Sequence, residues 1–149
     1  MTQYIYIASP MRLPNGSFGS NPLSSEQPNV FINELDFTDL YFDNNYYSKL
    51  KRKISYSSHF SFDYQVAAYS NHIPLGLVYK GTAEEVKCVT ILYSYLNEAL
   101  NASGVLEYFT CLSGKEDSAV SNKRNIRWMD IKDPYEIVLE DLEFWVITL

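Results

Sequence analysis

The stretch from Thr82 to Gly104 constrains the fold most, because it is the only long segment of the sequence with the periodicity of an amphipathic helix. Thr82 is suited to the N-cap, with Glu85 at the spacing of a capping box, and Gly104 is suited to a left-handed stop. Apolar residues that recur at steps of three and four form one stripe: Val86, Val89, Leu92, Tyr93, Leu96 and Leu100. Such a helix is marginally stable alone in water, so other parts of the chain must cover the stripe.

Most of the remaining sequence carries the signals of β-strands and turns. Strands are expected at 4–8, 30–42, 54–66, 73–79, 105–112, 125–131 and 144–149, and a short helical turn at 133–136. Segment 54–66 has the clearest alternation of apolar and polar residues, and a strand of that length would bend near Ser58.

The order of these elements predicts the fold class. Strands and helices do not alternate along the chain, which disfavours a parallel sheet and favours an α+β fold. We expect a curved, mainly antiparallel sheet of about six or seven strands packed on one long helix, at about 83–102. The length is typical of a single domain, here 1–149.

Residues 9–28 are expected to form an irregular loop, because four prolines interrupt both helix and central-strand pairing. Loops of this length in compact domains are usually functional or mobile. Ser17 and Gly19 belong to a glycine-containing turn whose backbone N–H groups can surround a phosphate, so both are candidate ligand-binding residues. No Lys-Ser or Lys-Thr pair follows, and no amphipathic helix begins there, which favours a plain flexible loop.

His59 is the candidate general base, because it shares the polar face of the expected strand 54–66 with Ser57, Ser61 and Asp63. Residues two apart on a strand are separated by about 6.5 Å, too far for a direct Ser–His–Asp relay within this strand. The solvated face of an antiparallel sheet explains the same residues without chemistry. We therefore predict no catalytic residue and retain His59 and Asp63 as candidate ligand-binding residues.

Aromatic and charged residues gather in two segments that are candidate interaction surfaces. The chain has 13 Tyr and 8 Phe, and tyrosine is frequent both in half-buried strands and at recognition surfaces. The candidate interaction residues are Tyr46, Tyr47, Glu136, Glu140 and Asp141. The two tyrosines precede a basic cluster at 49–53 that can bind single-stranded nucleic acid or discourage edge pairing, and the three acids are either solvated or face a basic partner. The formal net charge of −6 makes nucleic acid an unlikely partner.

No metal, cofactor or membrane is expected from the sequence. Cys88 and Cys111 have neither metal-ligand spacing nor the pattern of a disulfide framework, and two isolated histidines, His59 and His72, do not suggest a metal site. The N-terminus lacks the basic start and long apolar region of a secretory signal, and no apolar run approaches the length of a membrane span. Buried free thiols and a cytoplasmic location are the expectation.

Three functions are compatible with these observations. The favoured one is a small acidic protein–protein interaction domain of inhibitor or immunity type, which is non-catalytic and binds another protein. The alternative is a small-molecule-binding domain with an aromatic-lined cavity between sheet and helix, and the least favoured is a small enzyme using His59. A homo-oligomer is also compatible with the sequence. An exposed aromatic patch bordered by acids would favour the interaction domain. A pocket lined by Tyr and Phe would favour the small-molecule-binding domain, and polar groups converging on His59 would favour the enzyme.

Overall fold

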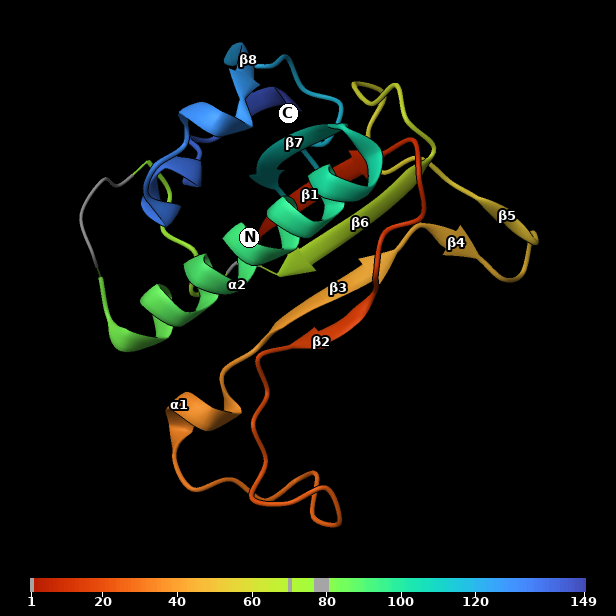
Figure 1. Ribbon diagram of the computed structural model, residues 1–149. Helices are drawn as coiled ribbons and strands as arrows, with labels where there is room; N and C mark the ends of the chain where they lie inside the picture. Colours follow the sequence, from red (N-terminus) through yellow and green to blue (C-terminus); the bar gives the residue numbers. More distant parts are fainter. Residues whose placement is uncertain (1, 70, 77–80) are drawn as a thin grey trace.

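A seven-stranded sheet packed against one long helix forms the body of the computed structural model, which describes residues 2–69, 71–76 and 81–149 (Figure 1). The strands are β1 (Gln3–Ser9), β2 (Gly16–Phe18), β3 (Leu40–Asn44), β6 (Tyr64–Tyr69), β7 (Val105–Leu112), β8 (Asn122–Arg127) and β9 (Glu143–Thr148). Their order is β2-β3-β6-β1-β7-β9-β8, and the neighbours are antiparallel except for the parallel pair of β8 and β9. A separate hairpin of β4 (Tyr46–Tyr47) and β5 (Arg52–Lys53) projects from one end (Figure 1). The predicted α+β fold is confirmed, whereas a single domain stays a prediction.

The long helix α2 spans Ala83–Ser103 and begins and ends as the sequence predicts. The Thr82 hydroxyl accepts a hydrogen bond from the Glu85 backbone N–H at 3.2 Å, and the Glu85 carboxylate accepts one from the Thr82 N–H at 2.9 Å. Gly104 ends the helix with a φ of 79°, which glycine adopts without steric cost. The buried residues of α2 are Cys88, Val89, Leu92, Tyr95, Leu96, Ala99 and Leu100. Val86 and Tyr93 of the predicted stripe are only half-buried, so the buried face is turned slightly from the expected one.

One face of the sheet packs against α2, which crosses in front of β1 in Figure 1. The strand register brings Ile7, Val66 and Tyr108 together on this face. Phe42 of β3 stacks on Tyr95 of α2 with ring centroids 3.8 Å apart. Because burying each large apolar side chain contributes about 1.5–3 kcal/mol, this layer is the main source of stability.

Irregular backbone, rather than a helix, covers the opposite face of the sheet. Its core of Tyr6, Ala67, Phe109, Cys111 and Phe144 is closed by Tyr56, Phe60 and Val120 from segments 54–63 and 114–121. The predicted strand 54–66 is therefore wrong except for its last three residues, which begin β6. Apolar and polar residues alternate in this segment because its aromatic rings pack on the sheet while the residues between them are polar. A period of two does not distinguish such a covering loop from a strand.

Other segments depart from the expected elements in specific ways. Segment 9–28 contains the short edge strand β2. Segment 30–42 contains the helix α1 (Glu34–Phe37), because Asn33 caps it by accepting a hydrogen bond from the Asp36 N–H at 2.8 Å. The expected strand 125–131 stops at Arg127, and the chain continues as the 3₁₀ helix η1 (Trp128–Asp130).

Two expectations near the end of the chain are confirmed, and one lies partly outside the described residues. β7 has the predicted bounds 105–112, and the predicted helical turn is the 3₁₀ helix η2 (Pro134–Ile137) with Asp133 as its N-cap. Residues 73–76 of the expected strand 73–79 form bends and irregular backbone and no strand, and residues 77–80 lie outside the described part of the chain.

Candidate functional site

The chain between β2 and β3, residues 19–39, forms an arm that extends away from the sheet (Figure 1). Backbone hydrogen bonds run across it, from the Asn21 N–H to the Asp36 carbonyl oxygen at 2.9 Å and from the Leu23 N–H to the Val30 carbonyl oxygen at 2.6 Å. The arm is therefore a hydrogen-bonded continuation of the β2–β3 pairing.

The base of the arm is anchored to the body by the turn that the sequence suggested as a phosphate cradle. Gly19 lies so close to α2 that an added Cβ would be 2.3 Å from the Ile91 Cδ1 atom. The Lys87 ammonium of α2 donates a hydrogen bond to the Leu35 carbonyl oxygen at 2.5 Å. The Ser17 hydroxyl donates to the Asp39 carboxylate, which would repel a phosphate. Ser17 and Gly19 thus hold the arm.

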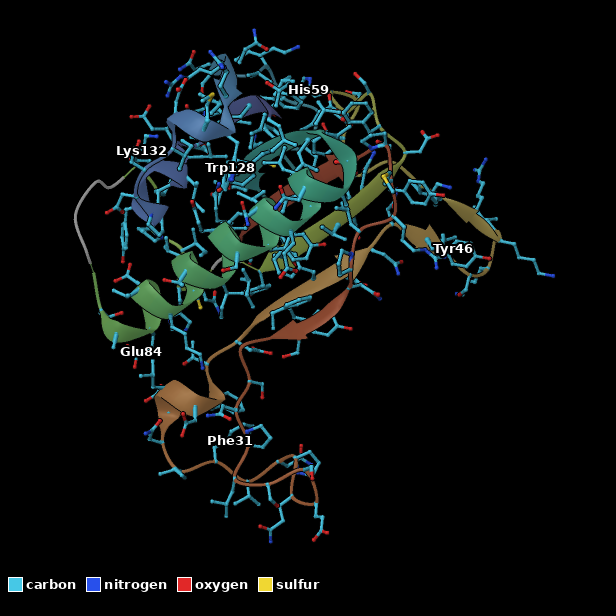
Figure 2. The ribbon with its side chains drawn as sticks, viewed as in Figure 1. Phe31, Tyr46, His59, Glu84, Trp128 and Lys132 are labelled. Atoms are coloured by element: carbon cyan, nitrogen blue, oxygen red, sulfur yellow. The ribbon has the colours of Figure 1, made fainter. Side chains whose placement is uncertain are left out.

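The arm carries large apolar side chains that the described part of the chain leaves exposed. Those exposed are Leu23, Val30, Ile32, Leu35 and Phe37, with Ile32 at 75% and Phe37 at 61% of full exposure. The Phe31 ring, labelled in Figure 2, contacts the Phe37 ring edge-to-face with centroids 5.2 Å apart. The charged residues of the arm are all acidic: Glu26, Glu34, Asp36 and Asp39. The arm therefore exposes five large apolar side chains and carries four acids and no basic residue.

His59 lies on the other side of the molecule, where segments 54–63 and 114–121 meet (Figure 2). Its Nε2 atom is 2.6 Å from the Ser118 carbonyl oxygen, and its ring contacts Phe109 edge-to-face at 5.7 Å. The Ser57 hydroxyl accepts a hydrogen bond from the His59 backbone N–H and donates to the Glu116 carbonyl oxygen. These bonds join two covering segments and leave Ser57 no free proton donor for a relay.

The other predicted ligand-binding residue, Asp63, does not converge on His59. Its carbonyl oxygen accepts a hydrogen bond from the Asn45 side chain at 2.9 Å, while its side chain is exposed. Asp63 therefore serves the backbone junction between the hairpin and β6.

The predicted interaction residues fall on two separate regions. Tyr46 and Tyr47 lie on the β4–β5 hairpin, whereas the acids lie near η2, close to Lys132 on the opposite side in Figure 2. The Glu136 carboxylate accepts hydrogen bonds from the Lys132 and Asp133 N–H groups, at 3.0 and 2.9 Å. Their role in partner binding stays a prediction.

The same holds for the remaining two acids of this set. Glu140 is exposed, and its backbone N–H donates to the Glu143 carboxylate at 2.9 Å. Asp141 accepts a hydrogen bond from the Gln3 side chain at 3.3 Å.

The cysteines lie in environments that keep them protonated. Burial raises the pKa of the Cys88 thiol to about 11 and that of Cys111 to about 12. Both are free and buried, and neutral thiols are poor nucleophiles. Within the described residues, no group of three or more His, Cys, Asp or Glu side chains could hold a metal ion.

Membrane insertion by a helix finds no support in the described parts of the chain, where every helix is too short or too polar to cross a bilayer. The cytoplasmic location stays a prediction.

Sequence reasoning missed the arm, although a signal was present. Large apolar residues recur between 23 and 37 among prolines, asparagines and acids, without a period that would bury them on one face. Comparison with known proteins adds no identification, since no protein-family model, curated protein or solved structure matches this chain.

Proposed function

We propose that this protein is a non-catalytic interaction domain of inhibitor or immunity type that docks its arm on a partner protein. The observation that carries the proposal is the exposure of the five apolar side chains of the arm, Leu23, Val30, Ile32, Leu35 and Phe37. Burial of apolar surface is worth about 25 cal/mol per Å², and contiguous exposed apolar patches mark interaction sites. A hydrogen-bonded arm also loses little conformational freedom on docking.

The charge of the arm indicates the kind of partner. Residues 19–39 contain four acids and no Lys or Arg. A second copy of this chain, with its net charge of −6, would place acids against acids, which disfavours a homo-oligomer built through the arm. We therefore expect a different protein with an apolar groove bordered by Lys or Arg side chains.

The two other functions receive less support. The His59 Nε2 atom is already engaged by the Ser118 carbonyl oxygen, which disfavours a general base at this position. Between sheet and helix, where the alternative function would place an aromatic-lined cavity, the Phe42 ring is stacked directly on Tyr95.

The test replaces the two most exposed side chains of the arm, Ile32→Asp together with Phe37→Asp. Tagged wild type and variant are expressed in the native host, retained proteins are identified by mass spectrometry, and the Kd for the purified partner is measured by calorimetry. A hot-spot side chain contributes about 2 kcal/mol, so each substitution should weaken binding about 30-fold. Both side chains are exposed, so the thermal unfolding of the variant should match that of the wild type.

Two control variants keep the arm intact. Met129→Asp places the same charge on a comparably exposed apolar residue, 57% exposed, in η1 away from the arm. His59→Ala removes the one side chain on which an enzyme was considered. Both should retain the partner with the wild-type Kd. Retention of the partner by the arm variant, or an equal loss with Met129→Asp, would refute docking through the arm.

A further inference from the structure

A pocket of about 460 Å³ opens at the end of the sheet, where β1 and β3 stop and the β4–β5 hairpin begins. Its wall includes Arg12, Asn15, Asn44, Tyr46, Lys53 and Tyr64. The volume lies within the range of about 300–1,000 Å³ that is typical of small-molecule sites. Figure 2 places Tyr46 on the hairpin, well away from Phe31 of the arm, so the pocket is a different surface from the proposed docking site.

One wall of the pocket is the segment that follows β1. The buried Leu13 side chain anchors this segment in the main core. The Tyr95 hydroxyl of α2 donates a hydrogen bond to the Pro14 carbonyl oxygen at 2.5 Å. These two contacts position the flanking residues Arg12 and Asn15 at the pocket without using their side chains.

The floor of the pocket is a network of buried amides. The Asn45 side chain donates to the Asp63 carbonyl oxygen at 2.9 Å and accepts from the Gln65 N–H at 3.2 Å. The Gln65 side chain in turn accepts from the Tyr56 N–H at 2.7 Å and donates to the Phe62 carbonyl oxygen at 2.9 Å. Satisfied buried networks of this kind are rigid, so the pocket exists before a ligand arrives.

The hairpin supplies the opposite wall through its strand register. Tyr46 pairs with Lys53, and Tyr47 pairs with Arg52. Paired residues share a face of the hairpin, and neighbours along a strand point to opposite faces. The pair Tyr46–Lys53 therefore faces the pocket, and the pair Tyr47–Arg52 faces away from it. Only the first pair contributes to the lining. The Lys53 ammonium lies 4.5 Å from the centre of the Tyr64 ring.

The pocket is cationic in an acidic protein. Among the described residues, Arg12 and Lys53 line it and no carboxylate does, while the chain carries a net charge of −6. Within the described residues, the Arg12 guanidinium and the Asn15 amide have no hydrogen-bond or ion-pair partner, so their donors are available. A planar guanidinium fork fits phosphate oxygens in bidentate fashion, and an ammonium adds a point charge.

We propose that this pocket binds a small phosphorylated compound with a planar ring, of the size of a nucleoside monophosphate. The phosphate lies between Arg12 and Lys53, and the ring packs on Tyr46, as bases pack on aromatic side chains. The Asn15 amide supplies a donor and an acceptor for the edge of the ring, and the Asn44 amide, whose oxygen accepts the Tyr46 backbone N–H at 3.0 Å, supplies an N–H donor.

The test measures the Kd values of AMP, GMP, UMP, adenosine, ribose 5-phosphate and inorganic phosphate for the purified protein by calorimetry. At least one nucleotide should bind tighter than both adenosine and ribose 5-phosphate, since each lacks one half of the recognised group. The hairpin offers matched variants: Lys53→Ala and Tyr46→Ser should each weaken nucleotide binding about tenfold, whereas Arg52→Ala and Tyr47→Ser should leave it unchanged. All four substitutions are at exposed positions, and thermal unfolding verifies the fold of each variant.

Several results would overturn the assignment. One is the absence of nucleotide binding at millimolar concentration in the folded wild type. Another is an equal loss of binding with Arg52→Ala and Lys53→Ala, which would indicate a general charge effect. A six-nucleotide single-stranded RNA that binds tighter than every mononucleotide would show that the pocket receives a nucleic-acid strand and not a free small molecule.

Discussion

The two faces of the sheet are closed in different ways. On one face, α2 lays down a regular stripe whose members, such as Leu92 and Leu96, have no exposed surface. On the other, segments 54–63 and 114–121 lie over an aromatic core with no regular structure of their own. A helix satisfies its backbone hydrogen bonds internally, whereas an irregular segment must find partners elsewhere.

Buried polar side chains provide those partners on the second face. The Glu107 carboxylate of β7, 4% exposed, accepts hydrogen bonds from the Ser61 and Phe62 N–H groups at 2.8 and 3.1 Å. The Gln65 side chain of β6 does the same for the Tyr56 N–H. An irregular segment can therefore cover a core when side chains of the sheet accept hydrogen bonds from its backbone N–H groups.

The largest effect is expected from removing an apolar side chain of α2, because we expect apolar packing to be tighter on the helix-covered face than on the other face. Leu92→Ala should lower the free energy of unfolding by about 3 kcal/mol, because a fully buried leucine leaves a cavity. Val120→Ala in the loop cover should cost about 1 kcal/mol, since this side chain is only partly buried. Urea unfolding of both variants gives the two values. Equal losses would mean that both faces are packed to the same degree.

A smaller effect is expected from the polar closure of the second face. Glu107→Ala removes the acceptor of two N–H groups and should cost about 2 kcal/mol. Hydrogen exchange at Ser61 and Phe62 should accelerate in this variant. Glu98→Ala, at an exposed position on α2, is the control and should stay within about 0.5 kcal/mol of the wild type. Protected amides in Glu107→Ala would show that apolar contacts alone hold the segment.

The smallest effects come from two tyrosines, one on each face. The Tyr108 hydroxyl donates to the Ile137 carbonyl oxygen inside the core at 2.7 Å, and the Tyr6 hydroxyl donates to the Glu116 carboxylate at 3.2 Å. Tyr108→Phe leaves a buried carbonyl unpaired and should cost about 1.5 kcal/mol, against about 0.5 kcal/mol for Tyr6→Phe. Urea unfolding at pH 7 measures both.

The pH dependence of the same pair has a defined sign. Burial raises the pKa of Tyr108, and burial followed by the Cys111 thiol and the Glu116 carboxylate raises the pKa of Tyr6. The folded state therefore holds these two protons more tightly than the unfolded state does. The contribution of the two hydroxyls to the free energy of unfolding is complete below the unfolded pKa of about 10 and is lost as pH rises above it. Each Phe variant should lose less stability than the wild type between pH 9 and about 11. If both Phe variants lose as much stability as the wild type over this pH range, groups other than these two tyrosines cause the alkaline loss of stability.

The residues that were predicted well act over short distances in the sequence. The capping box of Thr82 and Glu85 joins residues three apart, and the Gly104 stop needs one left-handed residue. The hydrophobic run of β7 is apolar on both faces, which matches a strand covered on both sides. By contrast, segment 54–66 has strand periodicity but lies mostly as a covering loop, because its partners Glu107 and Glu116 are some fifty residues away.

The candidate sites could be anticipated only in pieces. The sequence places Tyr46 and Lys53 in one aromatic and basic segment, but Arg12 lies in a segment expected to be a flexible loop. The arm could not be recognised because exposure depends on what the fold leaves uncovered. Ile32 and Phe37 are exposed, although isoleucine and phenylalanine are also the residue types found in the buried strands.

By itself, the sequence determined the α+β class, the bounds and caps of the long helix, and the strand that follows it, because local periodicity and capping chemistry act between residues a few positions apart. Only the tertiary structure decided which irregular segments seal the second face, where the arm projects, and that Arg12 and Lys53 meet at one pocket. Those features depend on contacts between residues far apart in the chain, and such contacts are set by packing and not by local pattern.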